Sequence, residues 1–191
     1  FSGCKKDESL WEIKNLNNNT ISAFGHGGMG ILYRYPMNSI QSLNHTLALG
    51  ADGTEFDIEL SRDGQLVLYH SVNLEDETNG KGKIRNKNWD ELKNVKYHLP
   101  YWDRAKLILA EDFFSHTGID SKRIFTFDCK VESRDDADYI STFSNALYQL
   151  IQKFHLEETS FIESYNLIFL KQLQSKDSRL KLFVHSSTYT D

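Results

Sequence analysis

Three carboxylates alternate with apolar residues in "TEFDIEL", residues 54–60. In an extended strand alternate side chains share a face, so Glu55, Asp57 and Glu59 project together. Parallel strands that alternate with helices are covered on both faces, so these carboxylates repel one another unless a cation neutralises them. A hard divalent cation, bound through oxygen, fits this need. The alternative is a strand face that is exposed to water.

A second charged pair occurs in "FDCKV", residues 127–131. Asp128 and Lys130 share one face of this predicted strand, and Cys129 lies on the other face as a core thiol. We expect Asp128 to complete the carboxylate cluster, which leaves the Lys130 ammonium to bind an anion such as a phosphate oxygen. The alternative is a structural salt bridge between Asp128 and Lys130.

Two histidines stand at the ends of predicted strands. His26 lies among glycines in "GHGGMG", and His70 ends "LVLYH". Catalytic groups in α/β sheets and barrels gather at the carboxyl ends of strands, and imidazole suits a general acid or base near neutral pH. Taken singly, each histidine is equally well explained as a capping or core residue. The remaining histidines lack this context and are assigned structural roles: His45, His98, His116, His155 and His185.

A predicted alternation of strands and helices positions these groups. Apolar runs predict core strands at about 20–25, 54–60, 123–131, 159–164 and 179–186. Helical spacing of apolar residues predicts helices at about 39–49, 89–95, 106–118, 134–156 and 165–178, the first of them capped by Asn38 or Ser39. This order is typical of a βα array with parallel strands.

Composition narrows the possible functions. The chain has 191 residues and a net charge of −5 at pH 7. Nucleic-acid binding usually leaves a basic footprint, so this balance argues against a general polyanion binder. No apolar run approaches the length of a membrane-spanning helix. The length allows one domain, which we place at 20–191 after a polar tether at 1–19.

The order and spacing of the motifs resemble the glycerophosphodiester phosphodiesterase family. The resemblance covers residues 20–185 and rests on "GHGG", "PMNS", "GADGTEFDIELSRDGQLVLYH", "ETNGKGKI", "WDEL", "LILAEDFF", "FTFDCK" and "FIESYNLIFLKQLQ". It implies an α/β fold of the TIM (β/α)8 barrel type, in which the "RDG" turn extends a strand instead of starting a new βα unit. The implied reaction cleaves glycerophosphodiesters to glycerol 3-phosphate and an alcohol.

The resemblance also implies roles for single residues. His26 and His70 are similar to the family's general acid/base pair, and Lys130 is similar to its phosphate contact. The implied ligands of a divalent cation, Ca²⁺ or Mg²⁺, are Glu55, Asp57 and Asp128.

Three positions depart from the family pattern. Gly27 stands where an arginine usually contributes to substrate binding by contacting phosphate. Ser71 stands where an aspartate commonly follows the second histidine, and Asp128 stands where the third metal ligand is more often glutamate. These departures predict an altered substrate or a weakened enzyme.

The length raises a separate expectation. A TIM barrel has eight βα units and typically about 250 residues, whereas five core strands are predicted here. We therefore expect a C-terminally incomplete barrel with about five of its eight βα units, and without the family's usual insertion after the second histidine.

The N-terminal "FSGCKKDES" resembles the lipobox of bacterial lipoproteins, in which small residues precede the lipidated cysteine. Cys4 would then carry a membrane anchor, and residues 1–3 would be the remnant of a removed signal peptide. This predicts an exported bacterial lipoprotein, anchored on the periplasmic or cell-surface side of a membrane. The alternative is an arbitrary N-terminus.

Two other functions stay open beside hydrolysis of a small-molecule glycerophosphodiester. A phospholipase-like phosphodiesterase would act on lipids or phosphoinositides, and "LPYW", residues 99–102, is the candidate apolar loop for it. A non-catalytic, phosphate-binding lipoprotein scaffold would fit the loss of arginine at Gly27. Such a scaffold has no need to keep both histidines and the carboxylate cluster together.

Overall fold

The computed structural model describes residues 22–30, 35–98, 105–117 and 123–185. The predicted tether at 1–19 with Cys4, and the "LPYW" segment, lie outside the described residues. The elements are, in chain order, β1 (Phe24–Gly25), α1 (Ile40–Ala48), β2 (Gly53–Leu60), β3 (Leu66–Leu68), η3 (Leu74–Asp76), η4 (Ile84–Asn86), α2 (Trp89–Leu92), β4 (Ile108–Leu109), α3 (Ala110–Thr117), β5 (Ile124–Cys129), α4 (Ala137–Lys153), β6 (Ser160–Ser164), α5 (Leu167–Lys176) and β7 (Lys181–Val184).

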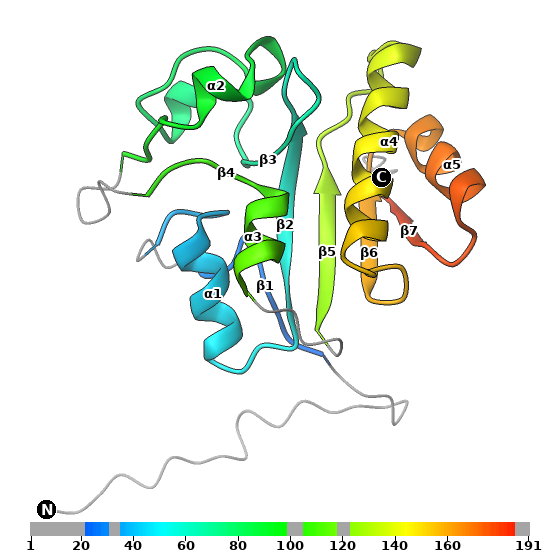
Figure 1. Cartoon of the computed structure of the whole chain (residues 1–191), viewed down its shortest axis with the longest axis horizontal. Helices are drawn as coiled ribbons and strands as arrows, with labels where there is room; N and C mark the ends of the chain where they lie inside the picture. Colours follow the sequence, from blue (N-terminus) through cyan, green and yellow to red (C-terminus); the bar gives the residue numbers. More distant parts are fainter. Residues whose placement is uncertain (1–21, 31–34, 99–104, 118–122, 186–191) are drawn as a thin grey trace, which may run out of the picture.

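Five strands form a parallel array in the order β1–β2–β5–β6–β7 (Figure 1). They correspond to the five core strands predicted from the sequence. β3 is antiparallel to β2, and β4 is antiparallel to β3. The turn at 61–65 is closed by a hydrogen bond from Ser61 N to Gln65 O, at 2.9 Å. The "RDG" turn therefore extends the second barrel strand into a hairpin, as expected.

The two faces of the sheet differ in character. Alternate strand residues, among them Phe56 and Phe127, join the main core with side chains of α1, α3, α4 and α5. The ring of Phe56 lies 5.0 Å from that of Phe113 and 5.6 Å from that of Phe127, measured between centroids. Cys129 is a buried core thiol, as predicted. The opposite face carries the carboxylates and is covered at Asp57 and Glu59, which are 1% and 6% exposed, as expected for a strand of a βα array.

Two local expectations need correction. Ser39 caps α1, since its Oγ accepts a hydrogen bond from Ser42 N at 3.2 Å, whereas Asn38 has a different role described below. The helix predicted at 106–118 begins only at Ala110, because Ile108 and Leu109 pair with β3 as strand β4. A short apolar run does not distinguish a strand from a helix by periodicity alone. None of the described helices has the length and apolar character needed to cross a bilayer.

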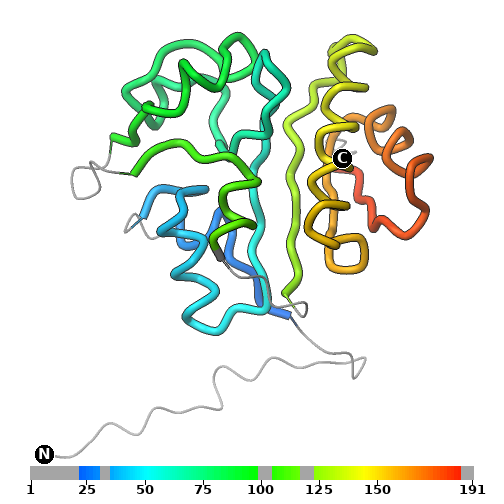
Figure 2. Tube along the Cα trace, in the orientation of Figure 1, coloured from blue at the N-terminus to red at the C-terminus, as the bar shows by residue number. Residues whose placement is uncertain are grey.

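A second, smaller core supports the segment that follows β3. It is formed by Val67, Tyr69, Leu74, Ile84, Leu92, Tyr97, Ala105 and Leu107. Tyr69 is fully buried, and its hydroxyl donates to Asn73 O at 2.8 Å. This core fixes residues 70–98 beyond the carboxyl end of β2, where the trace folds back over the edge of the sheet (Figure 2).

Candidate active site

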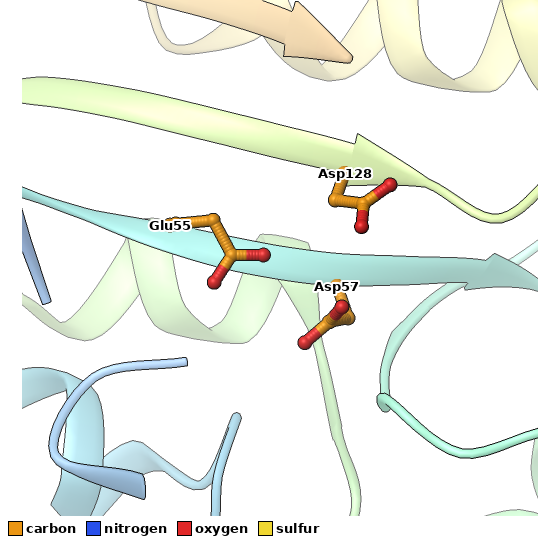
Figure 3. A group of neighbouring side chains, drawn as sticks. All are labelled: Glu55, Asp57 and Asp128. Atoms are coloured by element: carbon orange, nitrogen blue, oxygen red, sulfur yellow. The ribbon is translucent and has the colours of Figure 1, made fainter. Parts of the chain in front are cut away.

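Glu55, Asp57 and Asp128 come together on the polar face of the sheet. β2 and β5 are parallel neighbours in a register that places Asp57 beside Asp128, and Glu55 lies two residues earlier on β2. One carboxylate oxygen from each residue lies within 4.8 Å of the other two (Figure 3). Three hard oxygen donors at this spacing fit a divalent cation such as Ca²⁺ or Mg²⁺. The predicted cluster of these three carboxylates is therefore present in the structure.

Lys130 lies against this cluster. Its ammonium is 2.7 Å from Asp57 Oδ1 and 2.6 Å from Asp128 Oδ2. Burial disfavours the ammonium, but the carboxylates of Asp57 and Asp128 outweigh that effect and raise the pKa of Lys130 above its ordinary value. The site therefore holds one fixed positive charge beside three acids.

Glu55 is the acid that this charge does not satisfy. Its Oε2 accepts a hydrogen bond from Gly27 N at 2.7 Å, but no ion pair with it is formed in the described part of the chain. Burial, followed by the repulsion of Asp57, raises the pKa of Glu55 to about 8. A group held in this way is neutral at pH 7 and ionises when a cation is brought beside it.

Asn38 supports Asp57, a role that was not expected from the sequence. Its amide Nδ2 donates to Asp57 Oδ2 at 2.8 Å, and Asp57 N donates to Asn38 Oδ1 at 3.1 Å. Asn38 is fully buried and has a φ of 61°, a left-handed conformation that asparagine tolerates better than most residues. Because Asn38 stands just before a predicted helix, the sequence favoured a capping role for it. The pattern could not distinguish that role from support of Asp57.

His70 lies at the wall of a cavity of about 640 Å³ beyond the carboxyl ends of the strands. Tyr69 N donates to Asp57 O at 3.0 Å, so the backbone places His70 one residue past the level of the carboxylates. The cavity is also lined by Glu59, Lys83, Lys130, Tyr165 and His185. Burial raises the pKa of Glu59 to about 8, so this third acid of β2 is, like Glu55, mostly protonated at pH 7.

His26 occupies a different position from His70. It is exposed at the end of β1 and lines a separate open cavity with Phe24, Gly28 and Met29. The following residue, Gly27, links β1 to the carboxylates through its N–H bond to Glu55. The structure thus brings His70 and Lys130 to one cavity and leaves His26 on the other side of Gly27.

Two further residues extend the site and were missed in the sequence. Glu163 on β6 is the register neighbour of Asp128. His185 directly follows β7. Its Nε2 lies 3.2 Å from Glu163 Oε2 and 3.6 Å from Asp128 Oδ1. Its ring stacks on the ring of Tyr165, with 4.7 Å between the centroids. His185 ends the last predicted strand just as His26 and His70 end theirs, and this was the signal that could have identified it.

The chain is similar to known proteins in sequence and in fold. Residues 28–191 match the model of the glycerophosphoryl diester phosphodiesterase family. A glycerophosphodiester phosphodiesterase from Bacillus altitudinis is 39% identical over 137 residues, which are 72% of this chain and 56% of that protein.

Solved structures support the fold. A glycerophosphodiester phosphodiesterase from Agrobacterium tumefaciens superposes with a TM-score of 0.72 and 18% identity, over 85% of this chain and 66% of that one. A phosphodiesterase from Oleispira antarctica in complex with the product sn-glycerol-3-phosphate gives a TM-score of 0.71 and 18% identity, over 85% of this chain and 64% of that one.

The chain spans between 56% and 66% of the length of these three proteins. Its five parallel strands are accordingly part of a TIM-type barrel. The family match covers most of the chain and includes β2, β5 and their carboxylates. The chain belongs to the glycerophosphoryl diester phosphodiesterase family.

Proposed function

We propose that this protein hydrolyses glycerophosphodiesters to glycerol 3-phosphate and an alcohol, with a divalent cation as cofactor. The observation that carries the proposal is the cluster of Glu55, Asp57 and Asp128 beside Lys130, within reach of the cavity that His70 lines. Membership of the family supports the class of substrate. A scaffold without catalytic function has no use for three acids of which one has its pKa raised to about 8.

Glu55, Asp57 and Asp128 would hold Ca²⁺ or Mg²⁺ through carboxylate oxygens. When bound, such a cation polarises a phosphate oxygen and offsets the charge that develops on it. The Lys130 ammonium, already 2.6 Å from Asp128, is placed to bind a second phosphate oxygen. Lys130 supplies positive charge beside the acids, and hydrogen bonds are donated to them by Gly27 N and by Asn38 Nδ2.

His70 and His26 are the proposed acid and base. Cleavage of the phosphodiester needs one group to take a proton from the attacking hydroxyl or water and another to give a proton to the leaving alkoxide. His70 lines the cavity that would accept the alcohol head group, which suits protonation of the leaving oxygen. His26, on the glycine loop that binds Glu55, is assigned the role of base.

Gly27 replaces the arginine that contacts phosphate in the family, and its surroundings are adapted to glycine. Its φ is 54°, and a Cβ at this position would lie 2.7 Å from Met37 Cε. We therefore assign the phosphate-binding charge to Lys130 alone and expect a weaker hold on the phosphate.

The test is release of glycerol 3-phosphate by the full-length protein. Glycerophosphocholine, glycerophosphoethanolamine and glycerophosphoglycerol would each be supplied with Ca²⁺, with Mg²⁺ or with EDTA. Release that requires a metal and is lost in His70→Ala and in His26→Ala supports the proposal. Full activity in both variants, or release that EDTA leaves unchanged, would contradict the assigned roles.

A lipid substrate is the second candidate. Val72 and Tyr165 line the cavity and are each 60% exposed, which places apolar surface at its mouth. Such a rim suits an acyl chain on the glycerol of a lysophospholipid. Choline release from lysophosphatidylcholine, which would leave lysophosphatidic acid, is compared with choline release from glycerophosphocholine. A lipid substrate predicts faster release from lysophosphatidylcholine and a loss of that release in Val72→Ser. Glycerophosphocholine has no acyl chain to contact the rim and should be cleaved equally by Val72→Ser.

We also propose attachment to a membrane through Cys4, on the strength of the "FSGC" motif. The prediction is that cells labelled with a clickable fatty acid incorporate it into the protein and that Cys4→Ser abolishes both the label and recovery in the membrane fraction. Membrane recovery of Cys4→Ser at the level of the unmodified sequence would contradict it.

A further inference from the structure

Glu77 faces the imidazole of His70. Its Oε1 lies 3.6 Å from His70 Nδ1, within ion-pair distance and slightly beyond that of a hydrogen bond. Hydrogen bonds of catalytic groups are commonly long until substrate binds, and a small side-chain rotation would close this one. We propose that Glu77 is the positioning residue of His70 and accepts a hydrogen bond from the proton on Nδ1. The expected effect on turnover rests on the proposed function, whereas the expected effect on the His70 ring does not.

Ser71 contributes to this arrangement. It replaces an aspartate that commonly follows the second histidine in the family, and its own side chain points to the same acceptor. Ser71 Oγ donates to Glu77 Oε1 at 2.5 Å. A serine in this place offers no negative charge to an imidazole, but it holds the carboxylate of Glu77 beside the ring. The negative charge that Ser71 does not provide is thus provided by Glu77, six residues later.

The backbone around Glu77 is fixed. Glu77 O accepts a hydrogen bond from His98 N at 2.9 Å, and the next residue, Thr78, forms an antiparallel bridge with Tyr97. Thr78 N also donates to Leu74 O at 2.9 Å, and the Leu74 side chain is fully buried in the smaller core. The carboxylate therefore approaches His70 from a rigid support, as a positioning group must.

Other charged groups share the cavity with His70 but have different partners. Arg85 pairs with Asp135 at 2.6 Å, and Lys130 pairs with the carboxylates of Asp57 and Asp128. The remaining charged or titratable side chains that line it are Glu59, Lys83, Cys129, Glu132, Arg134, Tyr165 and His185. Within the described part of the chain, Glu77 is the charged group at ion-pair distance from His70.

The consequence is a defined tautomer. A carboxylate that accepts the Nδ1 proton keeps Nε2 as the ring nitrogen that exchanges a proton with the substrate. It also stabilises the imidazolium that forms when His70 takes up a proton. Without Glu77, no carboxylate holds the proton on Nδ1, so part of the population carries it on Nε2 and the ring samples more orientations. Turnover then falls while substrate binding is kept.

The kinetic test is Glu77→Gln, with Glu75→Gln as the matched control. Both changes remove one acidic charge from the same turn, and the Glu75 carboxylate accepts from Gly82 N, a contact that glutamine can keep. We expect kcat to fall about 10- to 100-fold in Glu77→Gln, with KM within about twofold of the unmodified enzyme. An equal loss in Glu75→Gln, or a loss confined to KM, would overturn the proposal.

The second test needs no activity. ¹⁵N NMR of histidine-labelled protein, with His70 assigned from His70→Gln, reports which ring nitrogen carries the proton. We expect Nδ1–H for the neutral ring of the unmodified protein and in Glu75→Gln, and a mixture of tautomers in Glu77→Gln. Identical spectra for His70 with and without Glu77 would overturn the proposal even in an active enzyme. A shift in Glu77→Gln would uphold it even if no glycerophosphodiester were cleaved.

Discussion

Asn38 and Asp57 are joined by two hydrogen bonds that close a ring between the loop before α1 and the centre of β2. One bond holds the Asp57 carboxylate and the other holds its backbone N–H. Both residues are buried, at 0% and 1% exposure, and Asp57 also pairs with Lys130. The orientation of a proposed metal ligand is therefore set by a residue that no metal would touch, as is common for carboxylate ligands.

The first prediction concerns Asn38. Asn38→Gly keeps the left-handed backbone but leaves the Asp57 carboxylate short of a donor, so it should lower the free energy of unfolding by about 1–3 kcal/mol. Asn38→Ala should cost about 1 kcal/mol more because of its φ. Urea denaturation measures both, and isothermal titration with Ca²⁺ and Mg²⁺ should show weaker binding in each. Unchanged metal affinity in Asn38→Gly would mean that Lys130 alone fixes Asp57.

The second prediction concerns Lys130. Lys130→Gln leaves the carboxylates of Asp57 and Asp128 side by side without their shared cation. We expect the free energy of unfolding without metal to fall by about 3 kcal/mol, since breaking one side of a buried ion pair leaves uncompensated charge. Added Ca²⁺ or Mg²⁺ should restore more stability to this variant than to the unmodified protein.

The control for this change is Lys106→Gln. Lys106 is exposed and its ammonium donates to Asn94, so the same change of side chain should alter stability by less than about 0.5 kcal/mol. Thermal unfolding with and without metal compares the two variants. A metal-induced gain that is equal in Lys130→Gln and Lys106→Gln would show that the lysine and the cation do not share the same carboxylates.

The third prediction is a pH dependence of stability without metal. Glu55 and Glu59 have pKa values raised from 4.5 to about 8, mainly by burial. Between about pH 5 and pH 8 the folded protein holds protons that the unfolded chain has lost, so the free energy of unfolding falls as pH rises. Urea denaturation at pH 5.5 and pH 7.5 measures the fall, and each glutamate-to-glutamine change should reduce it. A stability that rises over this range would contradict the assignment.

A fourth prediction follows for metal binding itself. At pH 7 Glu55 must lose its proton to act as a ligand, so binding of Ca²⁺ or Mg²⁺ should release about one proton. Calorimetric titration in two buffers of different ionisation enthalpy measures this number. Glu59→Gln should keep the release, because Glu59 lies outside the three-carboxylate cluster, whereas the weaker binding left in Glu55→Gln should release none. Binding enthalpies that do not depend on the buffer would contradict a ligand role for Glu55.

The carboxylate cluster was predictable because it depends on two short-range regularities. Alternation within β2 puts Glu55 and Asp57 on one face, and parallel pairing of consecutive barrel strands puts Asp128 beside them. Both can be read from local sequence once a βα array is recognised. The five parallel strands follow from the same regularities, with bounds that differ from the predicted ones by a few residues.

The supporting residues could not be predicted, because their contacts depend on tertiary structure. Asn38 reaches Asp57 only through a left-handed turn before α1, and Glu77 reaches His70 only because a bridge with Tyr97 folds its segment back. The strand β4 was missed for a similar reason. Its two residues are defined by pairing with β3, while their own sequence continues the pattern of the following helix.

The last prediction concerns Gly27, where the family usually has arginine. Gly27→Ala adds a Cβ at a φ of 54°, which should lower the free energy of unfolding by about 1–2 kcal/mol. Gly27→Arg should lower the free energy of unfolding by a similar amount. Met37→Ala, combined with Gly27→Arg, should restore part of this loss, because the added Cβ would lie 2.7 Å from the flexible end of Met37. Urea denaturation measures all three variants. Metal affinity should change little in Gly27→Ala, since the N–H that binds Glu55 is kept. Full stability in Gly27→Arg would show instead that this loop accepts a side chain without strain. The reason for a glycine at this position would then lie in substrate binding and not in the backbone conformation.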